Sequence, residues 1–219
     1  MKIKALIAVR SGSERVANKN LRAFAGSNLL TVKINQLKRI QALDGIVVNS
    51  NDQVMLDIAE SLGCTPVQRD PYYATSQVCM SDVYEHMAHN IDTDFILYAN
   101  CTNPLIKDRT ITDALATFRR NIGQYDSLNS AHLVKEFLFY NNLPINYSLT
   151  NQPRSQDLPD YFALNFAINI ISRENMIRYK NVVGSTPFIY GINETEAIDI
   201  DNPIDFSFAE FVFGGGLAY

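Results

Sequence analysis

The 219-residue sequence has no tryptophan and only three cysteines. Cys64, Cys79 and Cys101 are scattered along the chain, and none belongs to a Cys-x-x-Cys pair. A disulfide framework needs cysteines in pairs, and a cysteine-based zinc site needs them closely spaced. The cysteine pattern therefore argues against both kinds of cross-link.

Long charged runs and long apolar runs are also missing. The formal net charge is −4, and cations cluster no further than pairs such as Arg119 and Arg120, so we expect no nucleic-acid partner. No window reaches the roughly 18 apolar residues of a membrane helix, so we expect no membrane partner. The apolar run within residues 1–7 is too short for a signal peptide, which favours a cytoplasmic protein.

What the sequence does contain is an alternation of β-branched runs and helical patterns. Apolar residues recur every three or four positions between short strand-like runs, and this alternation is typical of a mostly parallel sheet with helices on both faces. Strands are expected at Ile3–Val9, Gly45–Asn49, Thr65–Gln68, Phe95–Ala99, Asp126–Ala131, Ala163–Ile171, Pro187–Gly191 and Glu196–Ile200. Helices are expected near 30–40, 54–62 and 111–118, around His86, and at Arg173–Tyr179 and Pro203–Val212.

The pattern predicts one α/β domain over residues 1–213, followed by a flexible tail at 214–219 with three consecutive glycines. Periodicity is weak between residues 134 and 161, where prolines, asparagines and aromatic residues are frequent. Long irregular stretches in a compact chain usually carry a function or contact another subunit. We therefore expect 134–161 to protrude and to form the interface of a homodimer.

The first expected strand ends in a basic loop that contains small residues. Arg10, Arg15 and Lys19 supply the cations, while Gly12 and Ser13 supply backbone freedom and exposed amides. A strand that leads into such a loop is how a parallel sheet presents a phosphate site at its carboxyl edge. The alternative is an ordinary basic surface loop, but its place directly after the first strand favours phosphate binding.

A pair of carboxylates near the end of the chain is the second chemical feature. Asp199 and Asp201 are two residues apart at the end of the expected strand Glu196–Ile200, and so would share one face of it. Two carboxylates on one face repel each other unless a cation lies between them, and Mg²⁺ prefers such oxygen ligands. The alternative is a solvated strand end.

The loop over residues 8–21 resembles the amino-terminal signature of the sugar-acid cytidylyltransferases, and its ending Lys-Asn-Leu is similar to the acylneuraminate branch. Ala17 stands where the family usually has proline. The resemblance implies a Rossmann-like nucleotidyltransferase domain with CTP and a 2-keto sugar acid as substrates. It implies nucleotide binding by Arg10, Gly12, Ser13, Arg15, Lys19 and Asn20, catalytic roles for Arg10, Lys19 and Asp201, and Mg²⁺ as cofactor on Asp199 and Asp201.

Two further blocks resemble the sugar-binding motifs of the family. Residues 97–106 imply that Asn100 and Thr102 bind the substrate, and residues 152–168 imply the same for Arg154 and Asn165. Ile106 and Ala163 stand where the family has arginines, so we expect a sugar site with fewer cations. Two weaker blocks are Val47–Asp52, where we expect Asn51 or Asp52 to cap a helix, and Arg69–Thr75, which resembles a loop that closes over the nucleotide.

The resulting expectation is cytidylyl transfer to a nine-carbon, sialic-acid-like 2-keto acid. The alternatives are activation of an eight-carbon or modified nonulosonic acid, such as the pseudaminic or legionaminic type, and a non-catalytic nucleotide-binding module with a decayed sugar site. The module is disfavoured because Arg10, Lys19, Asp199 and Asp201 are all retained, and a decayed site would have no reason to keep all four. A dehydrogenase is disfavoured because the first loop lacks the three spaced glycines of a dinucleotide fold.

Overall fold

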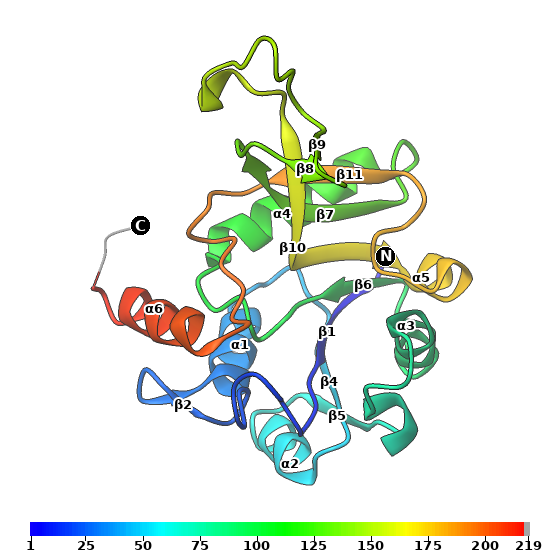
Figure 1. The fold of residues 1–219 in the computed structure, drawn as a ribbon. Coiled ribbons are helices and arrows are strands. Elements are labelled where there is room, and N and C mark those ends of the chain that lie inside the picture. Colours follow the sequence, from blue (N-terminus) through cyan, green and yellow to red (C-terminus); the bar gives the residue numbers. More distant parts are fainter. Residues whose placement is uncertain (217–219) are drawn as a thin grey trace.

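The computed structural model describes residues 1–216, so residues 217–219 of the expected tail lie outside the described part. A seven-stranded sheet forms the centre of the molecule, in the order β11-β7-β10-β6-β1-β4-β5 (Figure 1). Every neighbouring pair is parallel except the two that involve β10. The strands are β1 (Ile3–Ala8), β4 (Ile46–Ser50), β5 (Thr65–Gln68), β6 (Phe95–Tyr98), β7 (Ser127–Val134), β10 (Tyr161–Ser172) and β11 (Pro187–Gly191).

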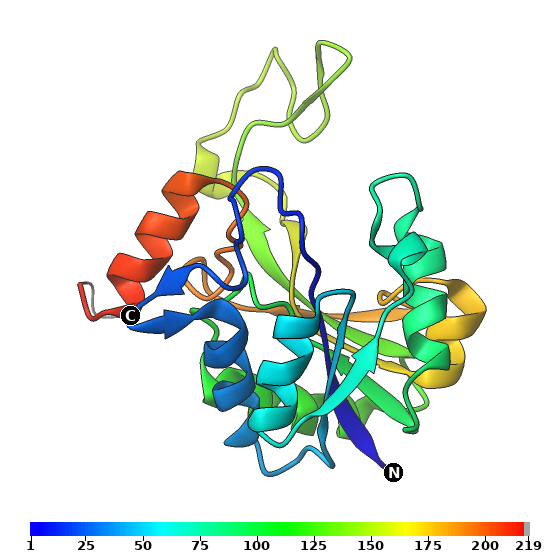
Figure 2. The same ribbon diagram turned by 90° about the horizontal axis from the view of Figure 1, so that it is seen from below.

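Helices cover both faces of this sheet, as the sequence predicts (Figures 1 and 2). Buried apolar side chains of α1, α2, α4 and α6 pack in one cluster, and those of α3 and α5 pack in a second. The helices are α1 (Leu29–Lys38), α2 (Gln53–Ser61), α3 (Met80–His89), α4 (Asp108–Asn121), α5 (Arg173–Tyr179) and α6 (Pro203–Phe213). None of the helices in residues 1–216 is long and apolar enough to cross a membrane.

Strand β1 shows why the sheet has two cores. Ile3, Ala5 and Ile7 pack into the larger cluster, whereas Leu6 packs into the smaller one. Successive side chains of a strand point to opposite faces, so a strand covered on both sides must be apolar at nearly every position. The apolar residues of β1, which Lys4 interrupts at one position, therefore predict its central place in the sheet.

The strand order reverses at β1. The chain runs from β1 outward to β4 and β5, and then returns to the other side of β1 to form β6. In open α/β sheets, the carboxyl ends of the strands at such a switch point leave a crevice where ligands bind. The basic loop after β1 and the loop after β6 both emerge at this place.

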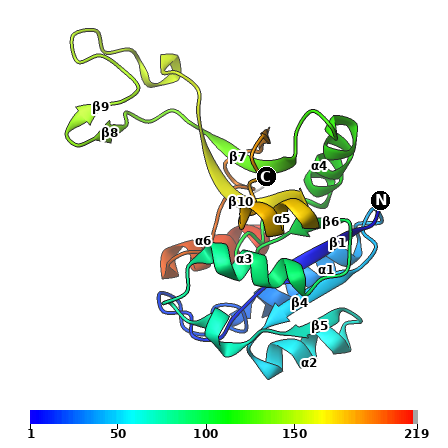
Figure 3. The ribbon, with the colours of Figure 1, turned by 90° about the vertical axis from the view of Figure 1, so that its right-hand side faces the viewer.

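Residues 134–161 extend away from the domain as an arm (Figure 3). The arm contains a small hairpin of β8 (Phe139–Tyr140) and β9 (Leu143–Pro144), and it leads into the long antiparallel strand β10. Another small hairpin, β2 (Ala23–Phe24) with β3 (Ser27–Asn28), precedes α1. The prediction that residues 134–161 protrude is confirmed, whereas their role in a dimer stays a prediction.

One predicted strand is wrong. Residues 196–200 form turns and irregular backbone rather than a strand, so Asp199 and Asp201 do not share a strand face. Their segment is instead fixed by hydrogen bonds to its neighbours, including one from the Ile200 amide to the Thr102 carbonyl (2.9 Å). In the predicted tail, residues 214–216 turn back onto α6, because the amide of Gly216 donates to the Phe211 carbonyl (2.9 Å).

Candidate active site

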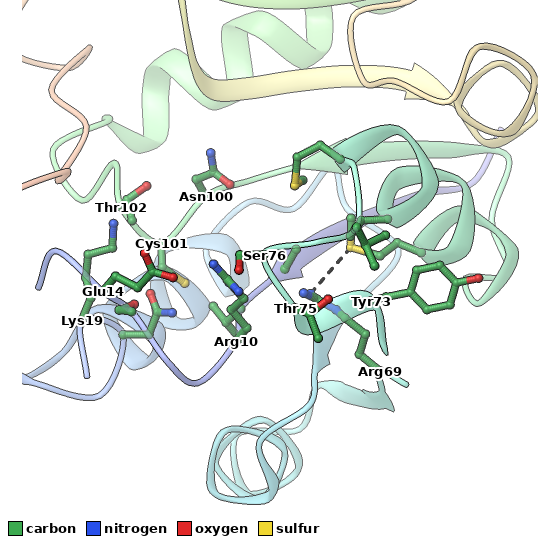
Figure 4. Close-up of a pocket in the computed structure, with 18 of the residues that line it drawn as sticks. Arg10, Glu14, Lys19, Arg69, Tyr73, Thr75, Ser76, Asn100, Cys101 and Thr102 are labelled. Atoms are coloured by element: carbon green, nitrogen blue, oxygen red, sulfur yellow. Dashed lines mark hydrogen bonds between the residues drawn. The ribbon is translucent and has the colours of Figure 1, made fainter. Parts of the chain in front are cut away.

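A cavity of about 490 Å³ opens at the carboxyl ends of β1 and β6 (Figure 4). Its walls come from the loop after β1, the segment after β5 and the end of β6. In Figure 4, Lys19 and Thr102 lie at one end of the cavity, Arg69 and Tyr73 lie at the other, and Arg10 and Asn100 lie between them. The cavity therefore joins segments that are far apart in the sequence at the switch point of the sheet.

The loop after β1 supplies most of the predicted nucleotide-binding side chains. Those that line the cavity are Arg10, Ser13, Arg15, Lys19 and Asn20. Gly12 does not line it; its φ of +80° is in the left-handed region, where glycine is favoured, so it allows the loop to turn.

Asn51 braces this loop from the end of β4. Its side-chain carbonyl accepts from the Ser11 amide (3.2 Å), and its Nδ2 donates to the Ser11 hydroxyl (3.0 Å). The helix cap that the sequence assigned to Asn51 or Asp52 belongs to Asp52, which accepts from the Met55 amide. Asp52 thus caps α2, and Asn51 fixes the basic loop.

The two predicted catalytic cations are held by backbone carbonyls. Arg10 donates to the Ala74 carbonyl (2.6 Å), and Lys19 Nζ donates to the Ile200 carbonyl (2.6 Å). Burial lowers the pKa of Lys19, and the nearby carboxylates of Asp199 and Asp201 oppose that shift. Each cation is therefore oriented before any ligand binds and needs little rearrangement to meet an anion.

The predicted metal ligands lie next to Lys19. Burial raises the pKa of Asp199, against a hydrogen bond from the Thr102 side chain, and the charge of Asp201 raises it further. The Oδ1 atom of Asp199 is buried without a hydrogen-bond partner among the described residues. Asp201 is more exposed and pairs with Arg15 (Nη2 to Oδ1, 2.7 Å).

The start of α6 fixes the backbone at Asp201. Asn202 and Asp205 form a capping box, and the Asp205 carboxylate accepts from the amides of both Asp201 and Asn202 (2.9 Å each). A carboxylate that binds two backbone amides is firmly held. Asp201 therefore lies directly before the capped start of α6, and these hydrogen bonds fix its backbone.

The loop after β6 brings two of the four predicted substrate residues into the cavity. Asn100 and Thr102 line it, and the Thr102 carbonyl accepts the hydrogen bond from the Ile200 amide (2.9 Å). Ile106 lies in the core with 2% of its surface exposed. It therefore supplies neither a cation nor apolar surface to the cavity.

The other two predicted substrate residues do not line the cavity. Arg154 lies in the arm and pairs with Asp157 (2.7 Å). Asn165 is buried in β10, where its Oδ1 accepts from the Ser130 hydroxyl (2.6 Å) and its Nδ2 has no partner among residues 1–216. The next residue, Phe166, has a φ of +55° at the irregularity in the β7–β10 pairing.

Sequence reasoning did not include Arg69 among the site residues. This arginine lines the cavity with only 4% of its surface exposed, and it donates to the side chain (2.6 Å) and the carbonyl (2.9 Å) of Asn49. The resemblance of residues 69–75 to a nucleotide-closing loop was the available signal. Glu14, Tyr73 and Tyr98 also line the cavity.

Comparison with known proteins places this site in a family. The model of the cytidylyltransferase family matches residues 4–211, which is nearly the whole chain. The chain belongs to the cytidylyltransferase family, and it is an enzyme of that class. This membership contradicts the dehydrogenase alternative.

Curated relatives match over most of the chain at low identity. Post-translational flagellin modification protein B of Campylobacter coli is 24% identical, with 94% of this chain and 92% of that protein aligned. CMP-N,N'-diacetyllegionaminic acid synthase of Legionella pneumophila is 25% identical, with 96% and 95% aligned. N-acylneuraminate cytidylyltransferase of Escherichia coli is 24% identical over 95% of this chain, but only 51% of that longer protein is aligned.

The fold is also found among solved structures. The structure of a CMP:2-keto-3-deoxy-manno-octonic acid synthetase complexed with CTP superposes with a TM-score of 0.74 at 12% identity, covering 99% of this chain and 100% of the other. At that identity, the likeness establishes the fold alone. It confirms the Rossmann-like α/β domain that the sequence predicts.

Proposed function

We propose that this enzyme transfers the cytidylyl group of CTP to a 2-keto sugar acid of the sialic-acid-like, nonulosonic class. The anomeric hydroxyl of the acid attacks the α-phosphorus of CTP, and pyrophosphate leaves. The observation that carries the proposal is that Arg10 and Lys19 line the cavity, while the carboxylates of Asp199 and Asp201 lie close to Lys19.

The chemistry that these residues supply is orientation and charge neutralisation. Arg10 and Lys19 bind the triphosphate, together with the loop amides near Gly12 and Ser13. In the transition state, negative charge moves onto the departing pyrophosphate. Cations that are already held in place therefore stabilise the transition state more than the ground state. Asn100 and Thr102, which line the cavity, would orient the sugar acid.

The residues present fit a magnesium ion. The buried Oδ1 of Asp199 lacks a partner among residues 1–216, and carboxylate oxygen is the donor that Mg²⁺ prefers. Asp199 and Asp201 would hold the ion, which supplies further neutralisation of phosphate charge when bound. Asp201 pairs with Arg15 in this structure, and if Asp201 held the ion instead, that guanidinium would be available for phosphate.

The metal assignment predicts that Asp199→Asn and Asp201→Asn each lower pyrophosphate release by roughly a hundredfold or more at ordinary Mg²⁺, because an amide oxygen is a poorer ligand for a hard cation. The measurement is the steady-state rate as a function of Mg²⁺ concentration, with circular dichroism to verify the fold. Rates within about threefold of wild type for both variants would remove the assignment.

Within the substrate class, a modified nonulosonic acid of the legionaminic or pseudaminic type is favoured over N-acetylneuraminate. Ala163 and Ile106 supply no cation where the family motif has arginines, and two of the relatives carry names that refer to legionaminic acid or flagellin modification. An eight-carbon acid is the second candidate, and it differs from the first in length and substituents.

The experiment that tests the function is pyrophosphate release from CTP against a panel of 2-keto sugar acids. We expect turnover with CTP in preference to UTP, GTP or ATP, and a higher kcat/KM for a deoxy or N-acylated acid than for N-acetylneuraminate. An N-acetylneuraminate value that equals or exceeds every other acid would overturn the substrate preference. Absence of turnover with all acids would overturn the proposed reaction.

A further inference from the structure

Helix α1 contains a lysine in the hydrophobic core. Lys33 has only 1% of its surface exposed, and its helical neighbours Leu30, Ile34 and Leu37 are buried core residues. Burying an ammonium group away from water is costly unless hydrogen bonds replace its hydration. The helix pattern by itself would be satisfied by an apolar residue at position 33. The presence of an amine there therefore indicates that its hydrogen bonds have a role.

The contacts of Lys33 identify what the amine does. Its Nζ donates to Oε1 of Gln36 (2.7 Å) on the same helix and to the backbone carbonyl of Asn103 (2.9 Å) in the loop after β6. Both acceptors are neutral, whereas the nearby Asp108 is hydrogen-bonded by Arg39 and Gln36. Lys33 is therefore a tether from helix to loop rather than half of an ion pair.

The tethered loop continues directly into the site. Nδ2 of the buried Asn103 donates to the Ile198 carbonyl (3.0 Å), and the Thr102 carbonyl accepts from the Ile200 amide (2.9 Å). These two bonds hold the residues on either side of Asp199. A continuous path thus leads from Lys33 through Asn103 to the segment that carries the proposed metal ligands.

Gln36 reinforces the tether from the same helix. Its Nε2 donates to the Ile106 carbonyl (2.5 Å), three residues beyond Asn103. Helix α1 therefore binds the loop after β6 at two backbone carbonyls that have no partner in the sheet. The two bonds fix the part of the loop that presents Asn100 and Thr102 to the cavity.

We propose that Lys33 is a positioning residue for the reaction: by binding the Asn103 carbonyl, it holds Thr102 and the segment around Asp199 in the geometry that transfer requires. Lys33 does not itself line the cavity. The kinetic part of this inference rests on the proposed cytidylyl transfer, whereas the structural part does not.

The test compares Lys33→Met with Lys38→Met. Methionine keeps the length and apolar stem but donates no hydrogen bond. Lys38 is an exposed lysine of the same helix, and its Nζ donates to the Leu62 carbonyl (3.0 Å). Hydrogen exchange is measured on the amides of residues 99–106 and 196–201, with 46–50 as an internal reference. We expect both segments to exchange roughly tenfold faster in Lys33→Met, while the reference and the Lys38→Met protein match wild type.

A second variant covers the case in which Lys33→Met does not fold. Asn103→Ala leaves Lys33 in place and removes the next link, so exchange should rise in residues 196–201. Unchanged exchange in 196–201 in every folded variant would overturn the tether.

The kinetic measurement separates positioning from stability. At a temperature well below unfolding, Lys33→Met should lose roughly tenfold to a hundredfold in kcat with KM for CTP changed by less than about threefold, since small misplacements of reacting groups are costly. A kcat within about twofold of wild type would overturn the positioning role. If the wild-type enzyme were inactive with every acid, the proposed function would be overturned instead. The hydrogen-exchange measurement would still show whether Lys33 holds the loop after β6 in place.

Discussion

At the scale of single residues, the two cations of the first loop are expected to act in the transition state. Arg10→Ala and Lys19→Ala should each lower kcat by roughly tenfold to a thousandfold, in addition to weakening CTP binding, because charge builds on the pyrophosphate as it leaves. The measurement is kcat and KM for CTP at saturating sugar acid. A loss confined to KM would show that these cations bind ground state and transition state equally.

Lys33 should also make the folding stability depend on pH. Burial lowers its pKa from 10.5 to about 8, so between these values the unfolded chain binds more protons than the folded one. Stability rises with pH wherever the unfolded state binds more protons. The contribution of Lys33 to the free energy of unfolding is therefore lowest below about pH 8, and it rises as the pH increases toward 10.5.

The Lys33→Met protein lacks this titration and provides the comparison. The free energy of unfolding of wild type, relative to that of the variant, should rise by on the order of 1–3 kcal/mol between about pH 7 and about pH 10, as measured by denaturant titration. Lys33 lowers the pKa of both Cys101 and Asp108, so the variant changes these two groups as well. In both folded proteins, however, the Cys101 thiol, whose pKa burial raises to about 12, stays protonated and Asp108 stays ionised from about pH 7 to about pH 10, so neither adds to the difference. A difference that does not vary with pH would contradict the prediction.

At the scale of elements, the amino-terminal cap of α6 links stability to the site. Asp205→Ala removes the carboxylate that accepts from the Asp201 and Asn202 amides, so it should cost about 1 kcal/mol of stability and also lower turnover. Ser172→Ala is the matched control, because it removes the cap of α5, which packs against the other apolar cluster.

The two variants are compared by thermal unfolding and by pyrophosphate release under saturating substrates. Both should lose similar stability, and Asp205→Ala alone should lose activity, by roughly fivefold or more at a temperature where both remain folded. Equal activity in the two variants would show that the cap does not position Asp201.

At the scale of the whole molecule, the arm predicts a homodimer. Tyr140 and Leu143 at its hairpin are 69% and 66% exposed, with Phe139 and Leu149 also exposed nearby. Exposed apolar groups gathered on one segment usually mark a contact with another protein. Light scattering at micromolar concentration should therefore give twice the chain mass.

Leu143→Asp should shift that mass toward the monomer, because it places a charge in the proposed interface. Ile204→Asp is the control, since Ile204 is an exposed apolar residue on α6, outside the arm. A wild-type monomer, or equal dissociation by both variants, would remove the arm from the interface.

The sequence by itself determined the layers of this protein. The buried run of β1 and the three-to-four-residue spacings of α1, α2 and α4 are local patterns, and local patterns decide strand, helix and buried face with little outside help. The basic loop after β1 was found for the same reason, because glycine, small residues and cations follow one another within a dozen positions.

The tertiary structure alone decided how the site is assembled. Residues 196–200 look like a strand in sequence, but long-range hydrogen bonds to Thr102 and Asn103 hold them as a loop, and no local pattern reports a partner about 95 residues away. Lysine is almost always exposed, yet Lys33 lies in the core and donates to a carbonyl 70 residues away in the sequence. Such contacts depend on which elements the sheet order brings together, and the sheet order is a property of the whole chain.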